Sequence, residues 1–343
     1  MVKNPEIVFL GTGAIGGSVG AWVAEHYENI YFLDRGKIQE ALKARGITIY
    51  HGGGRDRQET VPVKVFDSLD EAGDADFLVL GVKNYSLAEL AKQVHEKLGD
   101  RPVIISMANG VENQRVLPQY FSKVIYCVVS YNAWMDAPVV IGYQKKGPLI
   151  FGTLKNELQE EMKQLAGIFN QGVDTIITSH IQDAVHCKIV INLANSATTL
   201  VGHKLRPISD MRLYQKIMTS LLLEGVEIIR AAGYKECRLG GIPSWRTIWM
   251  GAKLPRFISG PLFRRNMSRM NLSSMAQDVI LRKCPDTELD SINGYIMELA
   301  EKYHVQARFN KAIYEICKQE FAKPEFQPMD VKELWAKIQQ RSS

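Results

Sequence analysis

The stretch that decides the fold is IVFLGTGAIG, residues 7–16. Its four leading apolar residues predict a short buried strand, and the glycines that follow have the spacing GxGxxG at the start of a helix that continues past Trp22. In such a unit the first glycine permits a tight turn, the second lets the backbone approach a pyrophosphate, and the third lets helix and strand pack closely. Because the N–H groups at a helix start favour anions, we expect a dinucleotide site here, the alternative being a purely structural turn. The residues expected to contact the dinucleotide are Gly11, Gly13, Ala14, Ile15 and Gly16.

The next strand-like run, Ile30–Leu33, bears on which dinucleotide binds. It is followed by Asp34, 18 residues after Gly16 and about where a ribose-binding residue is expected. A carboxylate here can accept hydrogen bonds from the ribose hydroxyls of NAD, whereas the guanidinium of Arg35 can bind the 2′-phosphate of NADP. Neighbouring side chains at a strand end point in different directions, so the pattern leaves both cofactors open.

The pattern of apolar runs changes along the chain and predicts two domains. Up to about residue 155, short β-branched runs alternate with helical stretches, as in a parallel sheet built from βαβ units, and the last three runs follow turns, so this sheet should finish antiparallel. After that point the periodicity is helical. We predict an α/β protein with an N-terminal Rossmann-type domain, residues 1–170, and a C-terminal all-helical domain, residues 171–343. The expected strands are Ile7–Leu10, Ile30–Leu33, Phe77–Val82, Val103–Met107, Val124–Ser130, Val139–Gly142 and Leu149–Phe151, and the expected helices are Ala184–Leu200, Leu213–Ala232, Asp286–Lys302 and Asn310–Phe321. Gly240–Pro261 looks like an irregular insertion, and the tail after Pro324 should add a short helix.

Composition excludes several classes of protein. The 343 residues are 46% hydrophobic and 23% charged, as in ordinary globular proteins, and no apolar run approaches the roughly 18 residues needed to span a bilayer. The five cysteines form no close pair in sequence, which favours reduced thiols over a zinc site or disulfides. No secretory signal is visible. We therefore expect a cytoplasmic protein with no metal, no membrane partner and no nucleic-acid partner.

Positive charge is concentrated in one segment. Arg230–Lys283 holds eleven Lys or Arg against two acids, although the whole chain carries only +5. Such a segment could draw an anionic substrate or a cofactor phosphate towards a cleft. A solvated surface loop is the alternative.

The most informative helix is the one expected over Ala184–Leu200. Lys188, Asn192, Asn195 and Thr199 are spaced 4, 3 and 4 apart, which puts them on one face of a helix whose other faces are apolar. A lysine among apolar neighbours is costly to bury without partners, and desolvation disfavours its charged form, which suits a residue that transfers protons near neutral pH. We expect this stripe to be functional, the alternative being the solvated face of a surface helix.

Two further positions look chemical. Asn109-Gly110 follows a predicted strand at the carboxyl edge of the sheet, where ligands bind in open α/β folds, although an ordinary turn would look the same. Glu288 stands in Thr-Glu-Leu-Asp, a helix-start signature, and we expect it in the first helical turn, where the dipole favours a carboxylate. A plain helix-start acid is the alternative.

Six motifs in one order resemble the ketopantoate reductase family over roughly residues 7–300. They are GTGAIGG from Gly11, Val82-Lys83, Asn109-Gly110-Val111, KIVINLAN from Lys188, Ser273-Ser274-Met275 with Gln277-Asp278, and TELDSING from Thr287. The resemblance implies a Rossmann domain followed by a helical domain, and NADPH-dependent reduction of 2-dehydropantoate to pantoate in pantothenate and coenzyme A biosynthesis.

The resemblance also implies roles for individual residues. Lys188 would be the general acid, Glu288 and Asn192 would hold the substrate's hydroxyl groups, and Ser274 would bind its carboxylate. Lys83 and Asn109 would contact cofactor and substrate, and Arg35 would take the 2′-phosphate. Asn195 joins the substrate-binding residues through the helical stripe.

The sequence also departs from the family pattern. The second Asn that the family often has eight residues after the lysine is replaced by Ser196, with Asn195 before it, and the insertion Gly240–Pro261 is longer than expected. We therefore expect a nicotinamide-dependent reductase of a small 2-oxo acid, NADP being the expected cofactor and NAD possible, with a homodimer as a possible assembly. A reductase of a larger 2-oxo acid and a non-catalytic nicotinamide-binding sensor are the alternatives, and the lysine argues against the sensor.

Overall fold

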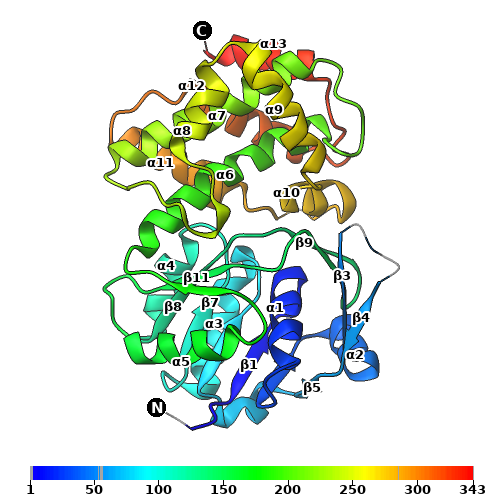
Figure 1. The fold of residues 1–343 in the computed structure, drawn as a ribbon, viewed down its shortest axis with the longest axis vertical. Coiled ribbons are helices and arrows are strands. Elements are labelled where there is room, and N and C mark those ends of the chain that lie inside the picture. Colours follow the sequence, from blue (N-terminus) through cyan, green and yellow to red (C-terminus); the bar gives the residue numbers. More distant parts are fainter. Residues whose placement is uncertain (1–2, 53, 55–56, 285, 343) are drawn as a thin grey trace. The chain divides into compact units, whose positions relative to one another are not determined.

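The computed structural model describes residues 3–52, 54, 57–284 and 286–342. By compactness the chain separates into two units, Met1–Gln182 and Asp183–Ser343, which run from blue to green and from green to red in Figure 1. The first unit is α/β and the second is helical, which confirms the predicted fold class. The predicted domain division at residue 170 stays a prediction, since compactness places the change of unit after Gln182.

The main sheet of the first unit is centred on β1 (Ile7–Leu10). β1 pairs in parallel with β2 (Ile30–Leu33) on one side and β6 (Phe77–Leu80) on the other, with Ile7 opposite Ile30 and Phe77. The strand order is β12-β11-β8-β7-β6-β1-β2-β5, so the order reverses at β1, and the crevice beyond the carboxyl ends of β1 and β6 is the place where open α/β sheets bind ligands. The other strands are β5 (Lys64–Val65), β7 (Val103–Ser106), β8 (Val124–Val129), β11 (Leu149–Gly152) and β12 (Thr175–Ile177).

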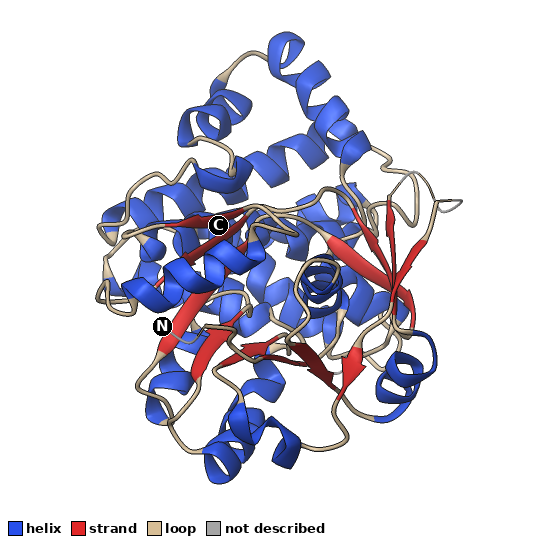
Figure 2. Cartoon of the chain, turned by 60° about the horizontal axis from the view of Figure 1, so that its bottom comes forward, coloured by secondary structure: helices blue, strands red, loops and turns tan. Residues whose placement is uncertain are grey.

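Two predictions about this sheet have different outcomes. The expected antiparallel finish is confirmed, because β11 runs antiparallel to β8. The placement of Val139–Gly142 in the main sheet is wrong: β10 (Val140–Tyr143) pairs with β3 (Ile47–His51) and β9 (Ala133–Ala137) in a second sheet of order β4-β3-β10-β9, where β4 is Glu59–Val61. Figure 2 shows both groups of strands in red. The prediction failed because it assumed that strands close in sequence share a sheet.

Helix α1 (Ala14–Ala24) packs between the two sheets. It contacts β1 and also β3, β9 and β10, and Val19, Trp22 and Val23 belong to the same buried core as strands of both sheets. The remaining helices of this unit are α2 (Gly36–Arg45), α3 (Asn84–Leu98), α4 (Glu112–Val116), α5 (Gln159–Phe169) and the short turns η1 (Leu69–Asp74) and η2 (Leu117–Gln119). α1 therefore has a fixed position, because both of its sides are packed.

The helical unit is built around two long helices of 21 residues, α6 (Ile181–Val201) and α7 (Met211–Ala231). Their buried residues form one core with α12 (Arg308–Phe321) and α13 (Val331–Ser342), the latter being the short helix expected in the tail. The other elements are η3 (Leu239–Gly241), α8 (Trp245–Lys253), α9 (Arg256–Arg269), α10 (Ser274–Ala276), the π-helical turns η4 (Gln277–Leu281) and η5 (Asp290–Gly294), and α11 (Tyr295–Lys302). Among the described residues, no helix is long and apolar enough to cross a membrane.

Two predictions for this unit were wrong. Gly240–Pro261 is largely helical, because its breaker residues stand mostly at helix ends: Pro255 is the N-cap of α9, and Pro261 lies on the exposed side of that helix. The helix expected from Asp286 begins three residues later, at Leu289, and the Thr287 hydroxyl caps its start by accepting the N–H of Leu289 at 3.3 Å. The Glu288 carbonyl oxygen accepts the N–H of Ile292 at 3.1 Å, so Glu288 lies at the start of this helix.

The contact between α12 and α13 gives a stability prediction. Glu320 is buried on α12 and pairs with Lys337 of α13 at 2.9 Å and with Lys323. Burial alone would raise the pKa of Glu320, but the hydrogen bonds from the two lysines outweigh it and lower the pKa. A lowered pKa stabilises the fold above the unfolded pKa of about 4.3, and this contribution is lost as the pH falls through the folded pKa. We expect E320Q to be about 1–2 kcal/mol less stable at pH 7.

Urea unfolding at a series of pH values checks this expectation. The difference between E320Q and wild type should shrink as the pH falls below about 4. E325Q, a substitution of an exposed glutamate four residues beyond the end of α12, is the control and should unfold like wild type. A difference that is absent at pH 7, or that persists at low pH, would contradict the role given to Glu320.

Candidate functional site

In the glycine turn after β1, the backbones of two other glycines pack against the carbonyl oxygen of Gly11. A Cβ on Gly16 would lie 2.3 Å from the carbonyl oxygen of Gly11, and a Cβ on Gly81, just after β6, would lie 2.3 Å from the same oxygen. Gly11 has φ +91°, and its own Cβ would lie 2.7 Å from Cγ1 of Val82. Glycine is therefore required at these positions by the packing of the chain on itself, before any ligand is considered.

Gly13 differs from its neighbours, and this difference fits a dinucleotide. It is the N-cap of α1, it has an ordinary φ of −68°, and the nearest atom to a Cβ placed there would be the Gly81 carbonyl oxygen at 3.8 Å. No side chain caps α1, and its first turn holds no acidic residue. Free N–H groups at a helix start with open space before them are what a pyrophosphate needs, so the residues present fit this part of a nicotinamide dinucleotide.

Asp34 fixes the second strand to the glycine turn. One of its carboxylate oxygens accepts the backbone N–H of Thr12, and the other accepts the N–H of Arg35 at 2.8 Å. Its own N–H donates to Gln39 at 2.9 Å. The carboxylate is thus engaged by the backbone of the turn, which gives it a structural task whichever cofactor is bound.

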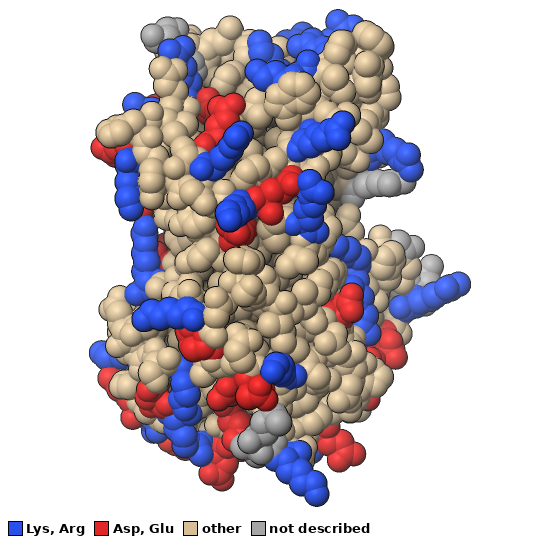
Figure 3. All heavy atoms as spheres, turned by 60° about the vertical axis from the view of Figure 1, so that its left-hand side comes forward, with Lys and Arg blue, Asp and Glu red and all other residues tan. Residues whose placement is uncertain are grey.

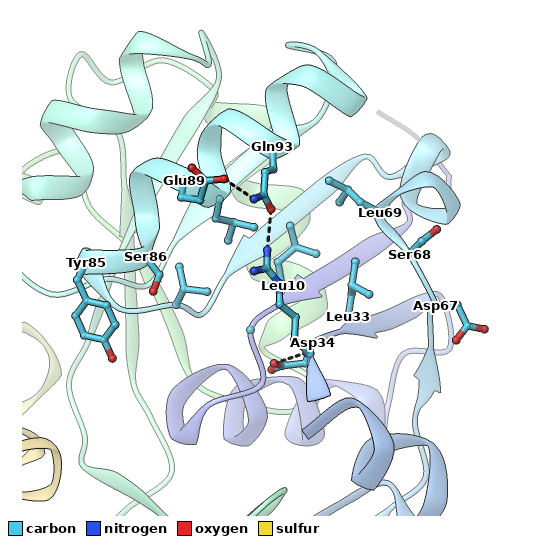
Figure 4. A pocket seen from close by; sticks show the side chains of 14 residues that line it. Leu10, Leu33, Asp34, Asp67, Ser68, Leu69, Tyr85, Ser86, Glu89 and Gln93 are labelled. Carbon is cyan, nitrogen blue, oxygen red and sulfur yellow. Dashed lines mark hydrogen bonds between the residues drawn. The ribbon is translucent and has the colours of Figure 1, made fainter. Parts of the chain in front are cut away.

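Arg35 reaches across to α3. Its Nη2 donates to Oε1 of Gln93 at 2.7 Å, and Nε2 of Gln93 donates in turn to Oε1 of Glu89 at 2.5 Å, as the dashed lines in Figure 4 show. This row of three side chains borders a cavity of about 560 Å³ within the first unit. The lining residues are Leu10, Gly11, Leu33, Asp34, Arg35, Asp67, Ser68, Leu69, Val82, Tyr85, Ser86, Glu89, Leu90 and Gln93.

Gln93 and Glu89 were not among the residues predicted from the sequence. Both lie on α3, where Tyr85, Glu89 and Gln93 are four residues apart and share one face of the helix. That spacing was visible in the sequence, but nothing in it indicated that this face meets Arg35, which is 58 residues away from Gln93. The contact follows from β2 and β6 lying on either side of β1.

Lys83 and Asn109 come to the same edge of the sheet as the glycine turn. Lys83 is the N-cap of α3 after β6, and Asn109 follows the neighbouring β7. Asn84 donates from Nδ2 to the carbonyl oxygen of Asn109 at 2.7 Å, and Asn113 donates to the Ser106 hydroxyl at 2.9 Å, so both loops are held by amide side chains. The structure therefore gathers every predicted cofactor-binding residue on one edge of one sheet.

In the helical unit, the stripe on α6 is not a solvated surface. Asn192 is buried, and Lys188 and Asn195 are only partly exposed. The alternative of a surface helix is therefore wrong. Thr199 is also buried, but its hydroxyl donates to the carbonyl oxygen of Asn195 at 2.7 Å. This bond lies within α6 and uses the donor of the hydroxyl.

Hydrogen bonds fix other segments along α6. The Ser273 hydroxyl accepts from Thr198 at 3.2 Å, and Nδ2 of Asn293 donates to the Ser196 hydroxyl at 3.2 Å. Ser273 directly precedes Ser274, and Asn293 lies in η5, which begins shortly after the buried carboxylate of Glu288. The structure thus holds the segments that carry Ser274 and Glu288 beside the helix that carries Lys188.

Both of these segments continue as π-helix. η4 begins three residues after Ser274, and η5 begins two residues after Glu288. π-turns are rare and occur often at functional sites. Their pairing with two predicted substrate-binding residues is a second structural sign that this part of the helical unit binds a ligand. Among the described residues, no cluster of His, Cys, Asp and Glu could hold a metal ion.

Comparison with known proteins gives matches over most of the chain. The family model described as ketopantoate reductase PanE/ApbA matches residues 7–156, and the model of its C-terminal part matches residues 180–320. A 2-dehydropantoate 2-reductase of Pyrococcus abyssi is 25% identical over 315 residues, which is 91% of this chain and 97% of that one. One from Archaeoglobus fulgidus is 25% identical over 319 residues, 92% of this chain and 98% of that one.

Solved structures share the fold at lower identity. The crystal structure of 2-dehydropantoate 2-reductase from Geobacter metallireducens has a TM-score of 0.72 at 18% identity and covers 92% of this chain and 99% of its own. The ternary structure of D-mandelate dehydrogenase with NADH and anilino(oxo)acetate has a TM-score of 0.74 at 16% identity and covers 94% of this chain and 100% of its own.

The glycine turn gives a paired prediction that separates packing from ligand binding. G16A places a methyl group against the Gly11 carbonyl oxygen, so we expect it to destabilise the first unit by about 1–3 kcal/mol. G13A meets nothing closer than 3.8 Å, so stability should change by less than about 1 kcal/mol. If the pyrophosphate passes over Gly13, however, G13A should weaken dinucleotide binding about tenfold or more, which is 1.4 kcal/mol.

Thermal unfolding and fluorescence titration with NADPH measure the two effects separately. G13A that unfolds like wild type and also binds NADPH like wild type would show that α1 does not hold the pyrophosphate.

Proposed function

Because the chain belongs to the ketopantoate reductase family, we propose that it reduces a small 2-oxo acid to the 2-hydroxy acid with NADPH, the first candidate substrate being 2-dehydropantoate. The observation that carries this proposal is the polar stripe of Lys188, Asn192 and Asn195 on α6, a helix whose apolar residues are almost all buried. A helix that only packs has no need of a lysine and two amides in a row on one face. The relatives named 2-dehydropantoate 2-reductase support the same reaction.

In this proposal the residues of the helical unit bind the substrate and supply the proton. A bound reduced nicotinamide supplies a hydride to C2 of the 2-oxo acid. Lys188 donates a proton to the oxygen that becomes the new hydroxyl, a contribution of roughly 10² to 10⁴ in rate for a well-placed acid. Ser274 donates a hydrogen bond to the substrate carboxylate, and Asn192, Asn195 and Glu288 hold its remaining polar groups. Holding the substrate carbonyl beside the nicotinamide in this way reduces the entropy cost of bringing the two reactants together.

The preference for NADPH rests on Arg35. Its guanidinium is exposed at the edge of the cavity described above, while the neighbouring Asp34 is engaged by two backbone N–H groups. A 2′-phosphate would meet this guanidinium and the N-terminus of α2, for which Arg35 is the N-cap. NADH remains the alternative, because D-mandelate dehydrogenase of the same fold was solved with NADH.

A second candidate substrate is a larger 2-oxo acid. Two observations favour it: Ser196 replaces an Asn that the family often has, and D-mandelate dehydrogenase, solved with anilino(oxo)acetate, has the same fold.

We also propose a cytoplasmic location, since all five cysteines are free thiols. A homodimer is one assembly to test, since a ketopantoate reductase from Staphylococcus aureus described as dimeric shares the fold. Oxidation of NADPH and NADH with a panel of 2-oxo acids, including 2-dehydropantoate and phenylglyoxylate, decides between the candidate substrates and cofactors, and turnover with none of them would favour the non-catalytic sensor.

Substitutions of Lys188 and Glu288 should change different kinetic constants. K188A removes the proton donor and should lower kcat by about 10² or more, some 3 kcal/mol of transition-state stabilisation, while NADPH affinity stays near wild type. E288A removes a group that holds the substrate in both ground and transition states, so it should raise KM as well as lower kcat. K311A, on the exposed side of α12, is the lysine control and should turn over like wild type. Near wild-type kcat in K188A on the best substrate of the panel would exclude the proposed mechanism.

The row Arg35, Gln93 and Glu89 should control the choice of cofactor. R35A should weaken NADPH about ten- to a hundredfold, since hydrogen bonds to a charged group contribute about 1.5–3 kcal/mol, with little effect on NADH. Q93L removes the acceptor that orients the guanidinium and should change the NADPH-to-NADH ratio in the same direction by less. K92A, the neighbouring exposed lysine on α3, is the control for loss of nearby charge. Equal weakening of both cofactors by R35A would show that Arg35 does not bind the 2′-phosphate.

A further inference from the structure

The helices α8 and α9 expose apolar side chains on their outer faces. Phe257 is 80% exposed, Leu262 54%, and Trp249 and Ile258 50% each. Trp249 and Met250 are consecutive exposed residues of α8, and Phe257, Ile258 and Leu262 lie on the exposed side of α9, away from its buried Ser259 and Met267. Large side chains that protrude this far and lie together mark an interaction surface, whereas single exposed apolar residues would not.

The same faces carry five positive charges. Arg246 and Lys253 flank Trp249 and Met250 on α8, and Arg256, Arg264 and Arg265 lie on α9; all five are exposed. None of them forms an ion pair with a described residue, and the sequence holds no acid between Glu236 and Asp278. Figure 3 shows that both signs of charge are interspersed over much of the face drawn there, which makes a stretch without any carboxylate unusual for this protein.

The inner faces of these helices are packed, so the outer faces have a defined position. Ile248, Ser259 and Met267 are buried, and α8 and α9 both contact α7. The Ser259 hydroxyl accepts from Nε2 of Gln215 on α7 at 2.9 Å. A surface helix normally exposes polar residues and buries its apolar ones. α8 and α9 instead expose large apolar side chains together with basic ones.

We propose that the outer faces of α8 and α9 bind the surface of an anionic lipid bilayer. Helices that lie in the membrane interface combine Lys and Arg with Trp, Phe and Leu, and the two contributions act together: apolar side chains enter the headgroup boundary while the cations attract acidic lipids. From the sequence we expected no membrane partner, and this surface revises that expectation, although no helix of the described residues is long and apolar enough to cross a membrane.

Other occupants fit these faces less well. A second copy docking through the same faces about a twofold axis would place five unpaired cations against five more. Single-stranded nucleic acid stacks on aromatic rings, but three of the five protruding side chains, Met250, Ile258 and Leu262, have no ring to stack on. Aliphatic side chains between cations suit acyl chains below acidic headgroups.

Sedimentation of the full-length protein with vesicles tests the proposal. Vesicles of phosphatidylcholine with 30% phosphatidylglycerol should bind the protein at about 0.1 M NaCl and release it at about 1 M, where the Debye length falls from about 10 Å to 3 Å, and vesicles of phosphatidylcholine alone should bind it weakly. R264Q/R265Q should reduce the partition coefficient about 30-fold. F257S/L262S should reduce it as well, and K311Q/K332Q, which removes two exposed lysines of α12 and α13, should bind more tightly than R264Q/R265Q.

Fluorescence adds a signal from the surface itself. Trp249 should shift to shorter wavelength when anionic vesicles are added, and the shift should disappear in W249F, which keeps the other four tryptophans. The proposal is overturned if anionic vesicles bind no more protein than neutral ones, or if R264Q/R265Q and K311Q/K332Q bind equally. It is also overturned if light scattering shows a dimer that F257S/L262S dissociates, because the faces would then be buried between copies.

Discussion

The first unit depends on the close approach of three backbones at the carbonyl oxygen of Gly11. Gly16 at the start of α1 and Gly81 after β6 both come so near this oxygen that neither position has room for a Cβ. The approach fixes how far α1 stands from β1 and β6, and so directs the uncapped end of α1 to the crevice where the strand order reverses. The Asp34 carboxylate then ties β2 to the same turn through the N–H of Thr12. The position of Arg35 next to the cavity is a consequence of these contacts.

The helical unit carries a lysine and two amide side chains on a largely buried helix. Neighbouring segments hold this helix through hydrogen bonds to other polar side chains of α6. Ser273 and Asn293 bond to hydroxyls of α6 on either side of the stripe, and the Tyr295 hydroxyl bonds to His186 at 2.8 Å near its start. These three residues come from the two segments that also carry Ser274 and Glu288. The bonds that stabilise α6 are therefore the same ones that bring the predicted substrate-binding residues to it.

The sequence could predict features whose residues lie within a few positions of one another. The glycine spacing, the acid after the second strand and the stripe on α6 each lie within one strand, turn or helix, and all three were found. Gln93 was missed because its link to Arg35 depends on two strands that flank β1, and the second sheet was missed because β3 and β10 are far apart in sequence. Thr199 was assigned to the functional stripe because spacing shows which face a residue occupies but not that its hydroxyl bonds back to its own helix.

The insertion around α8 and α9 shows why the number of charges in a segment does not reveal its role. In sequence, Arg230–Lys283 was simply basic, and both a solvated loop and attraction of an anionic substrate were consistent with it. The structure separates these charges: Arg238 and Arg282 are paired with Glu236 and Asp278, whereas Arg256, Arg264 and Arg265 of α9 form no ion pair with a described residue and stand among exposed apolar residues. None of the residues proposed to bind cofactor or substrate lies on these two helices. Lipid binding and catalysis can therefore be abolished by separate substitutions, so the failure of one proposal would leave the other standing.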